Sequence, residues 1–188
     1  MRKTHLFTLI VIAFNVFTWA QEKQIEVTDI YQGTFSTEGM DALRSMNNGK
    51  QYTVLNINRI NQSSMIDKYD YKTLNKVSTI VSSSDLNDIP NFSAYSFSAD
   101  EKKILLSTEV EPIFRRSTLG VFYVYDVDTK KAVRISNTKI QEPTLSPDGK
   151  QVAYVKDNNI YLFNIGTGET EQVTTDGEKN KIINGVTD

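Results

Sequence analysis

The sequence contains no cysteine among its 188 residues, which excludes disulfides, thiol nucleophiles and thiolate metal sites. Histidine is almost as scarce, because His5 is the only one. If the first twenty residues are removed on export, the remaining chain can build neither a Ser-His-Asp triad nor a His-ligated zinc site. A Gly-x-Ser-x-Gly motif is also missing. We therefore expect this chain to contain no catalytic residue, no metal ligand and no cofactor site.

The chain has no excess of charge of one sign. Its formal net charge is -2, with 23% charged and 39% hydrophobic residues. This composition is typical of a globular protein rather than a disordered one. Because no basic excess is present, the electrostatic signature of a nucleic-acid-binding protein is missing. We expect no nucleic-acid partner.

Long hydrophobic runs are missing too, apart from one at the start. Residues 6–19 are largely apolar and follow Arg2 and Lys3. A membrane-spanning helix needs about 20 apolar residues, so this run is more typical of a signal peptide. We predict a signal peptide over residues 1–20, cleavage between Ala20 and Gln21, and export to the periplasm or the extracellular space. An uncleaved anchor or a buried amphipathic strand is the alternative.

No segment of the remaining chain has convincing helical periodicity, although residues 36–44 allow a short helical turn. Short runs rich in Val, Ile, Tyr, Phe and Leu are separated by residues that favour tight turns, which indicates an all-β fold. The predicted strands are residues 52–57, 103–107, 121–127, 151–156 and 159–165.

Two pairs of segments repeat in the same order. Residues 97–107 (FSADEKKILLS) match residues 145–155 (LSPDGKQVAYV), and residues 122–136 match residues 160–174, with a turn threonine at Thr129 and Thr167. About four strands in a period of roughly 40 to 50 residues are typical of β-propeller blades. We predict that residues 21–188 form an incomplete propeller of three to four blades of four-stranded antiparallel sheet. An ordinary β-sandwich is the alternative.

Residues 107–120 (STEVEPIFRRSTLG) stand out because they make one connection between matching strands ten residues longer than its counterpart. Loops on a rigid scaffold often carry binding residues, and arginine offers a planar fork of donors to oxygen atoms. Arg115 and Arg116 are therefore binding candidates. In the alternative interpretation, Glu109 and Glu111 simply pair with these arginines on a solvated hairpin.

Three aspartates are candidates for a calcium site. Asp126, Asp128 and Asp148 lie in D-V-D-T-K and S-P-D-G-K, which lack the acid count and the terminal glutamate of a calcium loop. We interpret them as turn residues.

Several segments, in this order, resemble the N-terminal propeller of the dipeptidyl peptidase IV family in its bacterial secreted form. The resemblance rests on residues 44–56, 104–117, 123–131, 145–161 and 182–188. It implies a serine-type peptidase of the prolyl oligopeptidase superfamily, with an eight-bladed propeller over a C-terminal α/β-hydrolase domain. Such enzymes release dipeptides from peptide N-termini in which proline or alanine is second. This chain would be a fragment that shapes the substrate cavity and lacks the triad.

The resemblance also implies a role for one residue. Arg115 matches an arginine that hydrogen-bonds the carbonyl of the substrate's penultimate residue, or Arg116 does if the register is off by one. The implied partners are peptides with Pro or Ala second, the missing hydrolase domain, and a second copy of the full-length protein in a homodimer. The competing function is a self-standing, non-catalytic, propeller-like binding protein of the cell envelope.

Overall fold

The computed structural model describes residues 25–37, 39, 42–58, 60–87, 89–113 and 117–186. The predicted signal peptide and its cleavage site at Ala20 and Gln21 lie outside these residues. The chain divides into two compact units, Met1–Met40 and Asp41–Asp188. The first contains a short helix, α2 (Val27–Tyr31). None of the helices in the described part of the chain has the length and apolar character that a membrane crossing requires.

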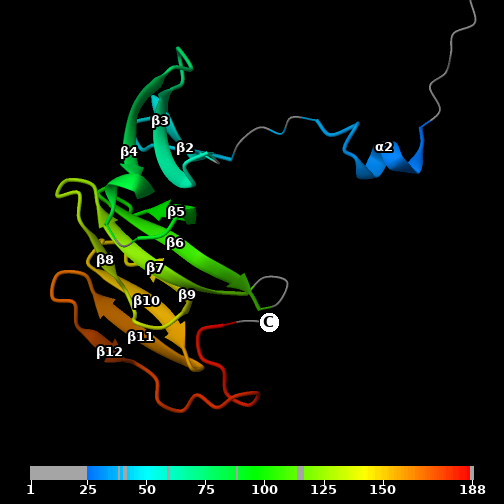
Figure 1. Ribbon diagram of the computed structural model, residues 1–188. Helices are drawn as coiled ribbons and strands as arrows, with labels where there is room; N and C mark the ends of the chain where they lie inside the picture. Colours follow the sequence, from blue (N-terminus) through cyan, green and yellow to red (C-terminus); the bar gives the residue numbers. More distant parts are fainter. Residues whose placement is uncertain are drawn as a thin grey trace, which may run out of the picture. The chain divides into compact units, whose positions relative to one another are not determined.

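The second unit consists of three four-stranded antiparallel sheets (Figure 1). The first sheet contains β1 (Leu43–Ser45), β2 (Gln51–Asn58), β3 (Ser63–Asp70) and β4 (Lys76–Ser82), and a 3-10 turn, η1 (Ser83–Asp85), follows it. The second contains β5 (Phe92–Phe97), β6 (Lys103–Pro112), β7 (Thr118–Asp126) and β8 (Ala132–Arg134). The third contains β9 (Gln141–Leu145), β10 (Gln151–Lys156), β11 (Asn159–Asn164) and β12 (Thr170–Gln172). The prediction of a partial β-propeller with four-stranded blades is confirmed. The helical turn that residues 36–44 would allow does not form at Leu43 and Arg44, because these residues belong to β1 and pair with β2.

The repeated sequence segments fold into repeated turns. At the turn that enters the second strand of the second sheet, Ser98 Oγ donates to Asp100 Oδ1 at 2.6 Å and accepts from the Lys103 N–H at 2.9 Å. In the third sheet, Ser146 Oγ donates to Asp148 Oδ1 at 2.6 Å. Short polar side chains that bond nearby backbone groups favour turns, so this chemistry explains why the segment recurs.

The turn between the third and fourth strands is also the same in each sheet. Its first residue accepts a hydrogen bond from the backbone N–H of a threonine three positions later, which fixes the chain reversal. The pairs are Thr73 with Asp70 (2.9 Å), Thr129 with Asp126 (2.7 Å) and Thr167 with Asn164 (3.1 Å). The threonine repeat read from the sequence is therefore confirmed and extends to the first sheet.

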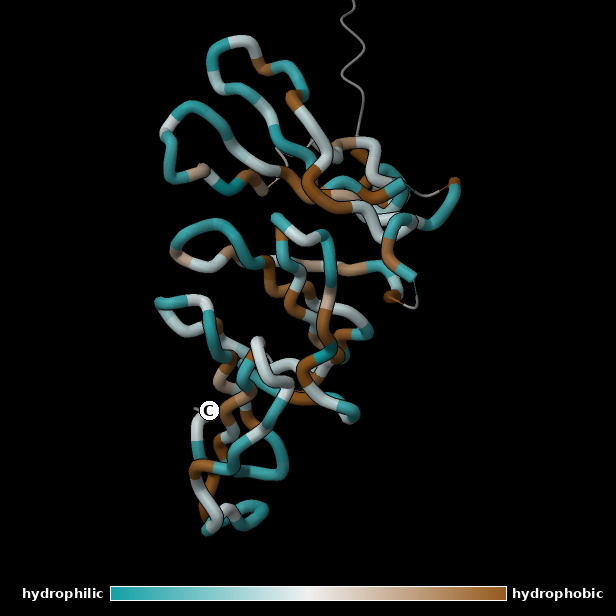
Figure 2. Tube along the Cα trace, turned by 90° about the vertical axis from the view of Figure 1, so that its left-hand side faces the viewer, coloured by the Kyte–Doolittle hydropathy of each residue, from teal (hydrophilic) through white to brown (hydrophobic). Residues whose placement is uncertain are grey.

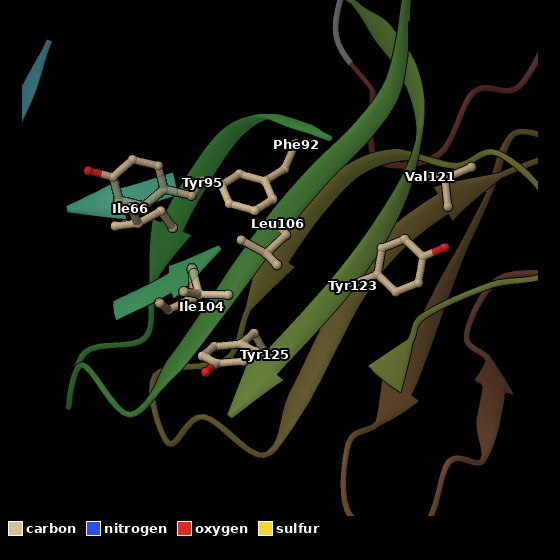
Figure 3. Packing of buried hydrophobic residues seen from close by; sticks show 9 residues of the cluster. Ile66, Phe92, Tyr95, Ile104, Leu106, Val121, Tyr123 and Tyr125 are labelled. Atoms are coloured by element: carbon tan, nitrogen blue, oxygen red, sulfur yellow. The ribbon is translucent and has the colours of Figure 1, made fainter. Parts of the chain in front are cut away.

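The second sheet is buried on both faces. Successive residues of a strand point to opposite faces, so Ile104 and Leu106 join one cluster while Leu105 joins the other. Figure 3 shows Ile66 of the first sheet among Tyr95 and Ile104 in the first cluster. Hydrophobic residues follow the strands and hydrophilic ones the turns (Figure 2). The two hydrophobic clusters pack the first and third sheets against the second, and the three sheets form the base for the site described next.

Candidate functional site

The hairpin of β6 and β7 extends beyond the rest of its sheet (Figure 1). The two strands remain paired as far as Pro112 and Thr118, whereas the matching hairpin of the third sheet already turns at Asp157 and Asn158. The ten extra residues were predicted to lie in a connection. The structure corrects this, because residues 108–112 and 118–120 belong to the paired strands β6 and β7.

A β-bulge lies where the hairpin leaves the sheet. The strand register shifts between Thr108 and Glu111, and Glu109 adopts a φ of 48°. Thr108 Oγ1 donates to the carbonyl of Val121 at 2.9 Å, which ties the two strands together just before the bulge. Bulges bend a strand and increase its twist, so this one sets the direction in which the hairpin tip projects.

The predicted binding residues Arg115 and Arg116 lie outside the described residues. On either side of them, the Ile113 N–H donates to the Ser117 carbonyl at 2.9 Å, which closes the hairpin tip. The role of Arg115 therefore stays a prediction. In the sequence Arg115 lies between Ile113 and Ser117, the two described residues that this hydrogen bond joins.

The linker between the second and third sheets is fastened to the base of this hairpin. Gly120 and Ile140 exchange two backbone hydrogen bonds, of 3.0 and 2.9 Å. A Cβ atom at Gly120 would lie 3.2 Å from both the Thr108 carbonyl and the Phe122 ring, so the close approach favours glycine. Next to this contact, Glu111 of the hairpin forms an ion pair with Lys139 of the linker.

A groove of ≈ 510 Å³ opens beside the hairpin base. Residues from β7, the linker before β9, the β10–β11 hairpin and the C-terminal segment line it. They are Leu119, Thr138, Lys139, Gln141, Val155, Lys156, Asp157, Asn158 and Lys179. No sequence motif indicates this groove, because its walls are brought together only by the packing of the two sheets.

Asn159, a buried residue at the start of β11, holds the C-terminal segment against the groove. Its Oδ1 accepts from Thr174 Oγ1 at 3.1 Å and from the Gly177 N–H at 2.9 Å, and its Nδ2 donates to the Asp157 carbonyl at 3.1 Å. Farther along, the Asn184 N–H donates to the Asn158 carbonyl at 3.0 Å. These bonds fix the segment that supplies Lys179.

The groove has a cationic lining. Within the described residues, the side chains of Lys156 and Lys179 make no hydrogen bond or ion pair, whereas Lys139 pairs with Glu111. Asp157 is the one carboxylate among the lining residues. Ammonium groups donate hydrogen bonds to carboxylate and carbonyl oxygens, so the groove suits an anionic or peptide ligand. The described part of the chain holds no cluster of side chains able to ligate a metal.

The three aspartates considered as calcium ligands lie at the opposite end of the sheets. Asp126 pairs with Lys103, Asp128 lies in the turn that follows β7, and Asp148 accepts the turn hydrogen bond from Ser146. The Lys103 ammonium, with the Thr129 N–H, lowers the pKa of Asp126 to about 2. Their predicted role as turn residues is confirmed.

Known proteins resemble this chain in sequence and in structure. Residues 98–188 match the family model described as the dipeptidyl peptidase IV N-terminal region. The crystal structure of Porphyromonas gingivalis dipeptidyl peptidase 4 is similar with a TM-score of 0.72 and 33% identity, over 84% of this chain and 22% of that one.

Curated relatives give the same result. The chain is 33% identical over 95 residues to a probable dipeptidyl-aminopeptidase B of Neurospora crassa, covering 48% of this chain and 10% of the relative. It is 34% identical over 112 residues to the human prolyl endopeptidase FAP, covering 58% of this chain and 15% of that protein. The chain thus spans only a small part of the length of the relatives it matches.

Proposed function

We propose, from the premise that this chain carries the N-terminal propeller region of a dipeptidyl peptidase IV-like protein, that the region forms part of the substrate cavity of a serine-type dipeptidyl peptidase. The part that lines the cavity would be the end of the sheets from which the β6–β7 hairpin projects. The whole protein would release Xaa-Pro and Xaa-Ala dipeptides from peptide N-termini. The propeller region would shape the cavity and orient the peptide, while a C-terminal α/β-hydrolase domain would supply the nucleophile, the base and the orienting acid.

The observation that carries this proposal is the projecting β6–β7 hairpin. A bulge and the Gly120–Ile140 bonds hold it on a rigid sheet, which is the kind of support that a substrate-orienting residue needs. Arg115 lies in the sequence between the last described residues of the hairpin, Ile113 and Ser117, and we propose that it donates a hydrogen bond to the carbonyl of the substrate's penultimate residue. Arg116 would take this role if the register differs by one.

We further propose that residues 1–20 are a signal peptide cleaved between Ala20 and Gln21, and that the protein acts in the periplasm or outside the cell. A homodimer of the full-length protein belongs to the same proposal. The alternative, a self-standing binding protein of the cell envelope, is less favoured, because the relatives and the crystal structure reported above are named as peptidases.

Expression of the complete reading frame tests the proposed function. The purified protein should release Gly-Pro from Gly-Pro-p-nitroanilide and the N-terminal dipeptide from longer peptides, as measured by absorbance and mass spectrometry. The matched control is the same substrate with an acetylated amino group, which should be cleaved far more slowly if the free N-terminus is recognised. Absence of cleavage of both substrates, or release of single amino acids, would contradict the proposal.

A further inference from the structure

We propose that the groove lined by Lys139, Lys156 and Lys179 binds a carboxylate of the peptide substrate. This inference rests on the proposed function, because it assigns part of the same substrate to the base of the same hairpin. It adds a preference among substrates that the recognition of a free N-terminus does not supply.

The first argument is charge. The groove presents two lysines without a partner among the described residues, against the single carboxylate of Asp157. Two uncompensated ammonium groups in one concave site raise the local concentration of anions. At the other end of the sheets, by contrast, Lys103 is paired with Asp126.

The second argument is shape. A groove of ≈ 510 Å³ falls within the range of ligand sites, and Leu119 and Val155 add apolar side chains to its lining. Thr138, Gln141 and Asn158 add neutral hydrogen-bonding side chains. Such a lining accommodates a peptide backbone together with an acidic group.

The third argument is the state of Lys139. Its side chain is 26% exposed, whereas that of its partner Glu111 is 64% exposed. Lys139 lines the groove, whereas Glu111 does not. An exposed ion pair contributes little, so an incoming carboxylate can take the place of Glu111. Glu111 acts as a competitor for the ligand, and its removal should strengthen binding while removal of a lysine weakens it.

The experiment compares the complete protein with its variants on matched peptides. Each peptide begins with Gly-Pro and continues with either glutamates or glutamines, and its C-terminus is either free or amidated. The readout is the ratio of kcat/KM for the acidic and the neutral peptide at low salt. We expect Lys156→Gln and Lys179→Gln each to lower this ratio about three-fold, the scale of one exposed ion pair, and added salt to lower it in the unmodified protein.

Glu111→Gln should change the ratio in the opposite direction, raising it about two-fold, because Lys139 is then free. Lys72→Gln is the matched control, since this exposed lysine lies in the β3–β4 turn at the far end of the first sheet. If only amidation of the C-terminus lowers kcat/KM, the groove binds the C-terminal carboxylate. If only replacement of the glutamates by glutamines lowers it, the groove binds acidic side chains.

Equal ratios in the unmodified protein and both lysine variants would overturn this inference while leaving the proposed function intact. If the protein cleaves none of the peptides, the proposed function fails instead. Fluorescence anisotropy with labelled acidic and neutral peptides then tests the groove directly. Equal binding of the two peptides would overturn the inference in that case as well.

Discussion

The hydroxyl groups of Thr53 in the first sheet and Tyr95 in the second lie 2.7 Å apart, buried between the two sheets. The Arg44 guanidinium lies over the same tyrosine ring, 5.1 Å from its centroid. Burial raises the pKa of the Tyr95 hydroxyl, which therefore stays protonated at neutral pH. One side chain thus joins two sheets through a hydrogen bond and a cation–π contact.

Replacing Tyr95 with phenylalanine should lower the free energy of unfolding by about 1 to 2 kcal/mol, because it leaves the buried Thr53 hydroxyl without its best partner. Chemical denaturation of the two proteins measures the difference. Tyr71→Phe is the control, since its hydroxyl bonds Ser45 on an exposed surface and should matter much less. Equal losses in the two variants would contradict the importance assigned to burial.

The sequence predicted the repeating part of this fold because its determinants are local. A serine and an aspartate two residues apart, or an aspartate and a threonine three residues apart, form their own hydrogen bonds and so appear as motifs. The contact of Arg44 with Tyr95 has no such signature, since the two residues belong to different sheets.

The candidate site was predicted less completely, for the same reason. The unusual length of residues 107–120 was visible in the sequence, but whether ten extra residues form a loop or longer strands depends on pairing across the hairpin. No sequence pattern predicts the groove. Lys139 and Lys179 come together only when the third sheet packs beside the second and Asn159 binds the C-terminal segment.

The ion pair of Asp126 with Lys103 makes stability depend on pH. Because the folded-state pKa, about 2, is below the ordinary value of 3.8, this pair stabilises the fold above about pH 4 and ceases to do so as the pH falls toward 2. Asp126→Asn should lower the free energy of unfolding by about 1 to 2 kcal/mol at pH 7, with a smaller loss at pH 3. Urea denaturation across this range, with Asp128→Asn of the same turn as control, checks the prediction. A loss that is independent of pH would contradict it.

The C-terminal segment should depend on a glycine that leaves no room for a side chain. A Cβ atom at Gly177 would lie 2.4 Å from the Asn158 carbonyl, which cannot move without disturbing the β10–β11 hairpin. We expect Gly177→Ala to displace residues 174–184 and to increase their amide hydrogen exchange, leaving the second sheet unchanged. Gly166→Ala is the matched control, because its nearest contact would be an ordinary 3.5 Å. Unchanged exchange in Gly177→Ala would mean that the segment is not held as described.

The hairpin tip gives the sharpest test of the proposed substrate site. In the complete protein, Arg115→Ala should reduce kcat/KM for Gly-Pro-p-nitroanilide. The reduction should correspond to a loss of about 1.5 to 3 kcal/mol of transition-state binding, the scale of a hydrogen bond from a charged group. Arg116→Ala is the neighbouring control and should retain most of the activity. Lysine at position 115 should restore only part of the loss, because an ammonium lacks the planar fork of arginine. The reverse pattern, with loss only in Arg116→Ala, would move the role by one residue, and full activity in both variants would remove the hairpin tip from the substrate site.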